Sequence, residues 1–333
     1  MAKSVSLPFC VPVFAHTQGI ASVGLVISNH PTAYNQILNQ AVSPCCSRKF
    51  LRGFTTPQVY IADFSLKKLS CIETYDVNLK FVHQYFHELV KRMMDEGYYV
   101  YYTGADDFFL PGKSWYGIRH MPHDGVLCGY DDEKRTYSIA AYDINWIYNL
   151  IEVSQDAMMQ AFEASMQQNI YGNLVAAKVK DISVDLDEHM ILKNIKAYLD
   201  WTVEKYSLEE DGWVKGIAVH DFLSMYLGKL LDGSIPYEKM DWRIMRLIWE
   251  HKKCMLDRIV AVEQKQGWND EISSAYQAIV EEANSIRMMY ALYHRKRRDS
   301  ILQNIQKRLA ALKERESEIL QTFIQCLEKK RNV

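Results

Sequence analysis

The sequence predicts an α+β protein with two domains, a mixed domain over residues 1–184 and an all-α domain over residues 185–333. Two observations support this fold class. Most of the prolines and the short β-prone runs lie in the first part of the chain, whereas from about residue 185 onward apolar residues recur at helical spacing. With 333 residues, 48% of them hydrophobic, the chain is long enough to form two cores.

The first domain is expected to begin with an extended segment over residues 6–15 and a short helix of small residues over 18–27. A second helix is predicted over 77–96, where apolar residues recur at helical spacing and Gly97 provides a stop signal. The aromatic and β-branched run at 98–102 predicts a strand that leads into a loop.

A β-hairpin is predicted next. The β-prone runs 126–130 and 136–142 are separated by the polar turn 131–135. His123 precedes the first run and Asp143 follows the second, so the ladder is expected to bring the two side chains together. This arrangement is typical of the histidine and carboxylate half of a papain-like catalytic site.

The second domain is expected to consist of helices, which the apolar pattern places over 187–206, 216–231, 238–265, 271–297 and 299–329. The last two are either separate or one continuous helix, since residues 294–298 contain no helix breaker. The last helix has a narrow apolar stripe, which suits a two-helix seam or a homodimer contact. His220, Asp221, Glu250 and His251 lack the spacing of metal ligands, so no metal is predicted.

Composition excludes several classes of function. A formal net charge of −2 provides no field that would attract nucleic acid or an anionic membrane. Seven cysteines without metal-type CxxC spacing, and no signal-peptide pattern, argue against a secreted disulfide framework. Apolar runs fall short of the roughly 20 residues that a membrane span requires. A cytoplasmic protein with reduced thiols is therefore predicted.

A papain-like site needs a base, an orienting group and a nucleophile at the start of a buried helix. His123 is the preferred base and Asp143 its orienter, with His120 as the alternative base. Both preferred residues could instead be polar loop residues that flank a hairpin. The nucleophile candidate at the start of the first helix is Thr17, whose alternative role is an N-cap.

Two cysteines are the other candidate nucleophiles. Cys10 lies in the extended segment among apolar residues, where a cysteine is usually a small buried hydrophobe. Cys46 follows Pro44 and would start a short helix over 47–51. The separation of Cys46, with Cys45 before it, from His123 in the sequence suits a compact cysteine-protease-like core.

Three residues are candidates for substrate binding. Asp107, with Asp106 before it, ends the predicted strand and would position an amine, or else forms a solvated turn. Trp115 and Tyr130 would line a substrate groove, or else belong to the core.

The motifs DDFFLP and HMPHDGVLCGYDDEKRTYSIAAYD resemble the N-terminal domain of the butirosin-biosynthesis BtrH-like proteins, which are papain-like and related in fold to the double-glycine (C39) leader peptidases. The resemblance extends loosely over residues 7–180. The helical motifs GIAVHDFLSMYLGKLL and DWRIMRLIWEHKKCMLDRI are similar to proteins encoded in bacterial nonribosomal-peptide and related thiotemplate clusters for antibiotic biosynthesis.

The resemblance implies acyl or aminoacyl transfer from a carrier-protein thioester to a small-molecule amine through a cysteine acyl-enzyme. It gives His123 the role of base and Asp143 that of orienter. It implies an acyl or peptidyl carrier protein as partner, with the phosphopantetheine arm as acyl donor and no other cofactor. Where the family places a cysteine after a histidine, this chain has His16 and Thr17.

Three functions are therefore expected, in decreasing order. The first is an amide-forming acyltransferase (amide synthetase), in which an activated thioester needs only positioning and a base. The second is a non-catalytic scaffold of the same fold that binds carrier proteins. The third is a C39-like cysteine peptidase.

Overall fold

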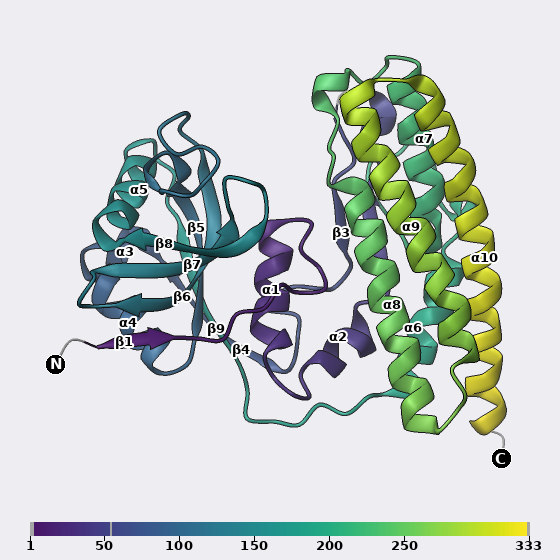
Figure 1. The fold of residues 1–333 in the computed structure, drawn as a ribbon, viewed down its shortest axis with the longest axis horizontal. Coiled ribbons are helices and arrows are strands. Elements are labelled where there is room, and N and C mark those ends of the chain that lie inside the picture. The colour runs from purple at the N-terminus through teal and green to yellow at the C-terminus, as the bar shows by residue number, and fades with distance from the viewer. Residues whose placement is uncertain (1–2, 54, 332–333) are drawn as a thin grey trace. The chain divides into compact units, whose positions relative to one another are not determined.

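The computed structural model describes residues 3–53 and 55–331, the last two by their backbone alone (Figure 1). By its internal contacts the chain divides into two units. The sheet unit comprises Met1–Tyr34 and Ser65–Ser183, and the helical unit comprises Asn35–Phe64 and Val184–Val333. The predicted α+β class is confirmed, with an antiparallel sheet and helices first and helices at the C-terminal end. The predicted domains, 1–184 and 185–333, differ from these units because residues 35–64 group with the helical unit.

An antiparallel sheet forms the centre of the sheet unit. Its order is β4 (Ile72–Asn78), β9 (Asn173–Val179), β5 (Tyr99–Asp106), β6 (Pro122–Asp131), β7 (Thr136–Tyr142) and β8 (Tyr148–Ser154), and β1 (Ser4–Ser6) also pairs with β6. The predicted hairpin is confirmed as β6 and β7, although β6 begins four residues earlier than expected. Its early part pairs with the end of β5, with Ala105 opposite His123.

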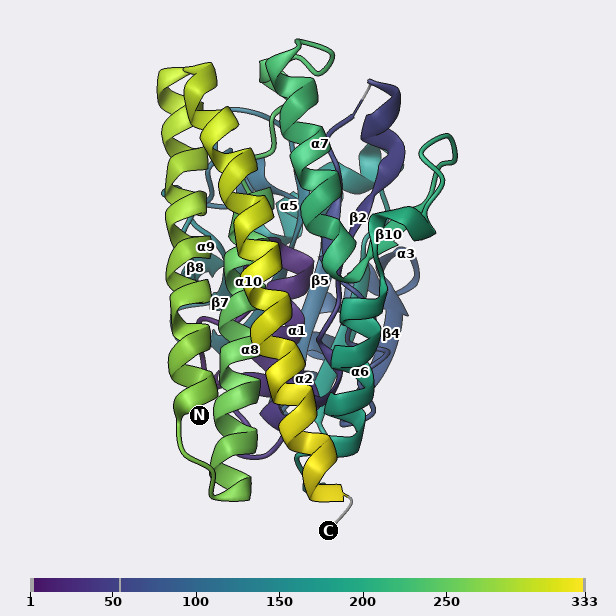
Figure 2. The same ribbon diagram turned by 90° about the vertical axis from the view of Figure 1, so that its right-hand side faces the viewer.

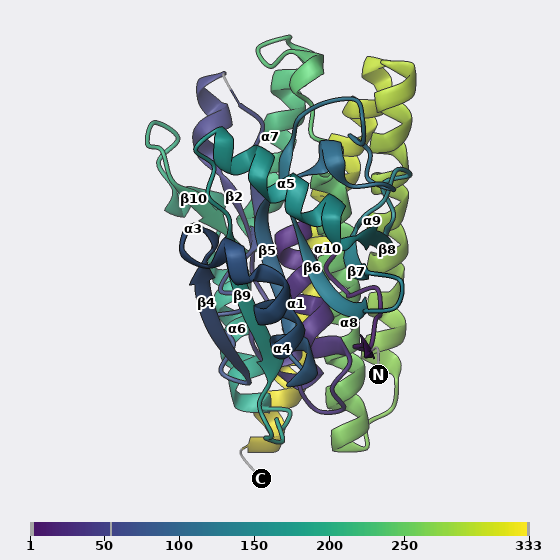
Figure 3. The ribbon, with the colours of Figure 1, turned by 90° about the vertical axis from the view of Figure 1, so that its left-hand side faces the viewer.

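Helices cover both faces of this sheet. α1 (Gln18–Ser28) packs on one face, against β6, β7 and β9. The other face carries α3 (Leu79–Val82), α4 (Phe86–Asp95) and α5 (Gln155–Gln167) (Figure 3). The helix predicted over 18–27 is thus confirmed as α1. Its small residues allow the preceding extended segment to approach closely, most of all at Gly24, where an added Cβ would lie 2.4 Å from Pro12 Cβ.

Gly24→Ala is expected to lower the free energy of unfolding by about 1–3 kcal/mol, because overpacking outweighs the gain in helix propensity. Thermal and urea unfolding followed by circular dichroism would measure this. Gly228→Ala is the matched control, since it too lies inside a helix but its Cβ would meet only Gln306 Nε2, at 3.6 Å. That control should stabilise by up to about 1 kcal/mol. Equal stabilisation by both substitutions would contradict the close contact.

The helix predicted over 77–96 is wrong in its first part. Residues 77 and 78 end strand β4, which pairs along its whole length with β9. The helix begins only at Leu79, where the Asn78 side chain accepts a hydrogen bond from Lys80 N, and the 3₁₀ turn η2 (His83–Tyr85) separates α3 from α4. The predicted strand at 98–102 is present but extends to Asp106 as β5.

The helical unit contains α6 (Glu188–Asp200), α7 (Val219–Leu231), α8 (Ile244–Gln266), α9 (Glu271–Lys296) and α10 (Asp299–Arg331) (Figure 2). It also contains α2 (Tyr34–Gln40) and a small sheet in the order β10 (Trp213–Lys215), β2 (Pro44–Ser47), β3 (Val59–Ile61). The remaining 3₁₀ turns are η1 (Arg48–Arg52), η3 (Asp107–Phe109), η4 (Val203–Lys205), η5 (Gly216–Ala218) and η6 (Tyr237–Lys239).

The last two helices are separate, because Arg297 adopts a left-handed conformation with φ 49° between them. The apolar stripe of α10 is buried within the chain, where the helix packs on α6, α7 and α9. A homodimer through these helices stays a prediction. None of the helices in the described part of the chain is both long and apolar enough to cross a membrane.

Two buried side chains of α8 explain why residues 35–64 belong to the helical unit. Arg258, which is fully buried, donates to Leu38 O at 2.5 Å and to Ala41 O at 3.0 Å. His251 donates from Nε2 to Val42 O at 2.7 Å. The guanidinium and the imidazole thereby satisfy carbonyls at and just after the end of α2, which the helix itself leaves unpaired.

Candidate functional site

The start of α1 is fixed against the end of β7. The buried Gln18 side chain donates from Nε2 to Ala140 O at 3.1 Å and accepts at Oε1 from Tyr142 N at 3.3 Å. These bonds place the first turn of α1 next to the strand that leads into Asp143. Gln18 was not predicted as a site residue, although it directly follows Thr17 in the sequence.

The start of β6 lies beside the same turn of α1. A Cβ added at Gly19 would lie 3.7 Å from Asp124 Oδ2 and 3.6 Å from Tyr101 Oη. Tyr101 donates its hydroxyl hydrogen to Asp124 Oδ2 at 2.6 Å. Asp124 therefore stands next to the first turn of α1. Asp124 was not among the residues predicted from the sequence, where its one signal was its position directly after His123.

His123 lies next to Asp124. Its Nδ1 is 3.2 Å from Asp124 O and 3.6 Å from Asp124 Oδ1, and its side chain is one-third exposed. Asp143 instead closes the turn that follows β7, where its Oδ1 accepts from Asn145 N at 2.8 Å and from Ile147 N at 3.0 Å. In residues 3–53 and 55–331 no hydrogen bond or ion pair joins His123 to Asp143. The carboxylate beside His123 is that of Asp124, and the orienting role of Asp143 stays a prediction.

Thr17 occupies the N-cap position of α1 with extended backbone angles, φ −137° and ψ 153°. Its hydroxyl makes no capping hydrogen bond, and the residue is only partly buried. The hydroxyl therefore does not cap the start of the helix. It lies at the first turn of α1, which Gln18 and Gly19 place next to β7 and β6.

The candidate cysteines lie elsewhere. Cys10 is hydrogen-bonded to Ser28, the last residue of α1, and burial raises the pKa of its thiol. Eleven residues of helix span about 16 Å, so Cys10 is at the end of α1 opposite to Thr17. Cys46 lies fully buried on strand β2 of the helical unit, where burial strongly raises its pKa. The short helix predicted over 47–51 is present as the 3₁₀ turn η1, which begins only after β2 ends. Both thiols are protonated at neutral pH and are poor nucleophiles there.

Asp107 is buried rather than in a solvated turn. Its side chain is 7% exposed and lies 3.5 Å from Lys113 Nζ, itself 2% exposed. Burial raises the pKa of Asp107, with Lys113 and His123 opposing that shift. Burial also lowers the pKa of Lys113, while Asp107 opposes it. The carboxylate is thus paired with a lysine within the chain and lies close to His123.

The two aromatic candidates differ in position. Trp115 is partly buried in the loop between β5 and β6, edge-on to Trp146 at 6.5 Å between ring centroids. Its neighbour Ser114 donates to Asp143 O at 3.0 Å, which brings this loop to the end of β7. Tyr130 is 4% exposed and donates to Asp95 Oδ1 at 2.7 Å. Seven residues of strand, about 24 Å, separate it from His123, so Tyr130 belongs to the core.

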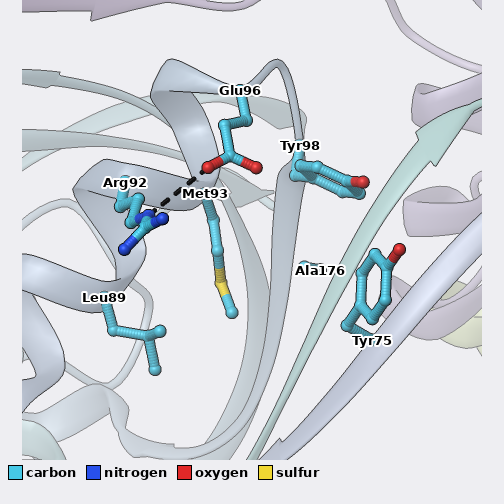
Figure 4. Close-up of a pocket in the computed structure, with 7 residues that line it drawn as sticks. All are labelled: Tyr75, Leu89, Arg92, Met93, Glu96, Tyr98 and Ala176. Carbon is cyan, nitrogen blue, oxygen red and sulfur yellow. Dashed lines mark hydrogen bonds and ion pairs between the residues drawn. The ribbon is translucent and has the colours of Figure 1, made fainter.

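A surface hollow of about 340 Å³ lies elsewhere on the sheet unit (Figure 4). It is lined by Tyr75, Leu89, Arg92, Met93, Glu96, Tyr98 and Ala176. Tyr98 immediately precedes β5, whereas Ala105, the partner of His123, is near the other end of that strand. The length of a strand therefore separates the hollow from the candidate site.

Among the described residues, no group of three or more His, Cys, Asp or Glu side chains is arranged to hold a metal ion. Comparison of the chain with models of known protein families gives no match, and neither does comparison with curated proteins. The feature of the chain that bears on function is therefore the meeting of α1, β6 and β7.

Proposed function

We propose that this protein is a BtrH-like, papain-like acyltransferase that moves an acyl or aminoacyl group from the phosphopantetheine thioester of a carrier protein to a small-molecule amine. The observation that supports it is the meeting of three chain segments at one place. The first turn of α1 reaches the end of β7 through Gln18 and lies beside Asp124 at the start of β6, next to His123.

This site provides the groups that the reaction needs. The amine nitrogen attacks the thioester carbonyl, a C–N bond forms, and the C–S bond breaks. The amine loses one proton as the C–N bond forms and the departing thiolate gains one, with His123 as a proton-transfer group. The first N–H groups of α1 have no partner within the helix and would stabilise the developing oxyanion.

Direct transfer is the form of the reaction that these residues favour. Thr17 takes the position where the family resemblance expects a cysteine, and an alcohol is a weak nucleophile without a strong base. A thioester is already activated, so positioning and base catalysis are sufficient. The Thr17 hydroxyl would then hydrogen-bond the substrate rather than carry the acyl group.

A carrier-binding scaffold is the second candidate, and one observation favours it. Asp143 uses its carboxylate to close a turn, which is a different role from orienting a histidine as a triad requires. Thr17 stands at the start of α1 where a cysteine triad would have its cysteine. A C39-like peptidase ranks lowest, because Cys10 lies at the far end of α1 and Cys46 is buried in the helical unit.

The test is amide formation from acyl-pantetheine thioesters and a panel of primary amines, followed by mass spectrometry. We expect product from the wild type, at least about a 100-fold loss in His123→Ala, and an activity in Cys46→Ala equal to that of the wild type. Thr17→Ala should keep most of the activity, and intact mass should detect no acyl adduct.

The opposite results would point to the other candidates. An adduct that disappears in Thr17→Ala would establish covalent transfer through that hydroxyl. A wild type that binds a loaded carrier protein but forms no amide with any amine would favour the scaffold.

A further inference from the structure

A second histidine of the sheet unit is held by a buried carboxylate. His120 Nδ1 lies 2.7 Å from Asp106 Oδ2, and Asp106 is fully buried. The other oxygen, Asp106 Oδ1, accepts from Met121 N at 2.8 Å and from Phe108 N at 3.1 Å. The ring of Phe108 stacks on the imidazole with 4.4 Å between centroids. Position and plane of the imidazole are both fixed.

This arrangement selects one tautomer of His120. Since a carboxylate only accepts hydrogen bonds, Nδ1 of the neutral ring must carry the hydrogen, and Nε2 has the free lone pair. The His120 side chain is 53% exposed, compared with 33% for His123. A buried carboxylate and an oriented, half-exposed imidazole together form the base half of a catalytic triad.

A purely structural role explains only part of this geometry. Asp106 closes the loop between β5 and β6 through the N–H groups of Phe108 and Met121, and it needs no imidazole for that purpose. The remaining carboxylate oxygen binds an imidazole whose side chain is half exposed. Because Asp106 pairs with Pro122 across the β5–β6 ladder, His120 and His123 stand on either side of that paired position.

We propose that His120 is a second catalytic residue, the base that accepts the proton of the acceptor amine, while His123 serves the thioester side of the reaction. As the C–N bond forms, the amine proton moves to His120 Nε2; as the C–S bond breaks, the thiolate takes a proton from His123 or water. This assignment rests on the proposed function. His120 is the more exposed imidazole, where a solvent-borne amine arrives, and His123 contacts Asp124, which lies beside the first turn of α1.

The test separates two reactions of butyryl-pantetheine, its hydrolysis and its aminolysis by ethanolamine, both followed by thiol release. His120→Ala should lower the amine-dependent rate about 100-fold and leave hydrolysis within about threefold of the wild type. Added imidazole should restore the amine-dependent rate of His120→Ala. His120→Gln, which keeps a donor for Asp106 but has no base, should be as slow as His120→Ala. His123→Ala should lower both rates.

A spectroscopic measurement tests the dyad without turnover. In long-range ¹H–¹⁵N spectra, wild-type His120 should be the Nδ1–H tautomer. In Asp106→Asn the carboxamide oxygen keeps the two backbone bonds, so its NH₂ group faces the imidazole and His120 becomes the Nε2–H tautomer, which cannot act as base. Asp106→Asn should therefore lose amine-dependent activity as His120→Ala does.

The outcomes distinguish the inference from the function it rests on. Thiol release by a wild type whose His120→Ala variant keeps its amine-dependent rate would overturn the role of His120 and leave the proposed function intact. If His120→Ala lost hydrolysis and aminolysis equally, and added imidazole restored neither, His120 would have only a structural role. A wild type without amine-dependent release would refute both, and the tautomer would then report only the geometry of Asp106 and His120.

Discussion

Lys252→Met is expected to lower the free energy of unfolding of the helical unit by about 3–5 kcal/mol, a large share of the stability of an ordinary domain. The substitution keeps an unbranched side chain of nearly the same length and removes the ammonium group, with its charge and its hydrogen bonds to Glu316 and Tyr198. The cost arises at Glu316, which would become an unpaired buried carboxylate.

The surroundings of Glu316 explain the size of this effect. Lys252 on α8 donates to Glu316 Oε2 on α10 at 2.6 Å, and both side chains are fully buried. Tyr198 donates to Oε2 at 2.9 Å and Tyr276 to Oε1 at 2.5 Å. The cluster thus ties α6, α8, α9 and α10 together, and each member depends on the charge of the others.

The double variant Lys252→Met/Glu316→Leu should recover much of the lost stability, because it removes both charges together. The matched control is Lys196→Met, which breaks an ion pair of the same kind between α6 and α10. That pair, with Glu328, is 49% and 45% exposed, so its loss should cost less than about 1 kcal/mol. Hydrogen exchange of peptides from α8 and α10 would measure each change. A loss in Lys252→Met no larger than in Lys196→Met would contradict the argument.

The helical unit shows which parts of the fold could be predicted from the sequence and which could not. Apolar spacing predicted the helices of the second domain, because each helix buries one face and that face repeats along the chain. It could not predict that residues 35–64 join them, since Arg258 and His251 contact carbonyls more than 200 positions away. Residues 72–78 form a strand because β9 pairs with them, and no local pattern contains that information.

The candidate site, too, could be predicted from the sequence only in part. Turn chemistry and alternation predicted the turn and β7 of the β6–β7 hairpin, but not that β6 already begins at Pro122 and includes His123. Which carboxylate faces which imidazole depends on bulges and on loop closure. A register shift between Tyr102 and Ala105 precedes the pairing of β5 with the start of β6, and Asp106 then bonds His120 across the loop. Spacing along the sequence does not determine such contacts.

Two buried histidines near Glu316 are expected to make the helical unit sensitive to acid. His220 donates from Nδ1 to Ile217 O at 3.0 Å, and its Nε2 lies 3.8 Å from Glu316 Oε2. Burial, with repulsion from Lys252, lowers the pKa of His220 to about 3, and the same two causes lower the pKa of His251 well below its usual range. Burial alone would raise the pKa of Glu316, but Lys252 and the histidines more than offset it, and the pKa falls to about 2.

The sign of the effect follows from these directions. Between pH 6.5 and about 3 the unfolded chain binds protons at His220 that the folded chain does not, so the free energy of unfolding falls as the pH is lowered. His251 acts in the same direction, and Glu316 adds to the loss below its unfolded pKa of 4.5. Each histidine should cost about 2 kcal/mol between pH 7 and pH 5.

Urea unfolding of the helical unit, followed by hydrogen exchange in α7 and α8 at pH 7, 6 and 5, would measure the slope. His220→Gln has no titrating group at this position, so it should remove about half of the loss between pH 7 and pH 5 while costing stability at pH 7. His189→Gln is the matched control, because His189 on α6 is exposed. Its profile should follow that of the wild type. If the free energy of unfolding of the wild type did not change over this pH range, His220 and His251 would have the same pKa in the folded protein as in the unfolded chain.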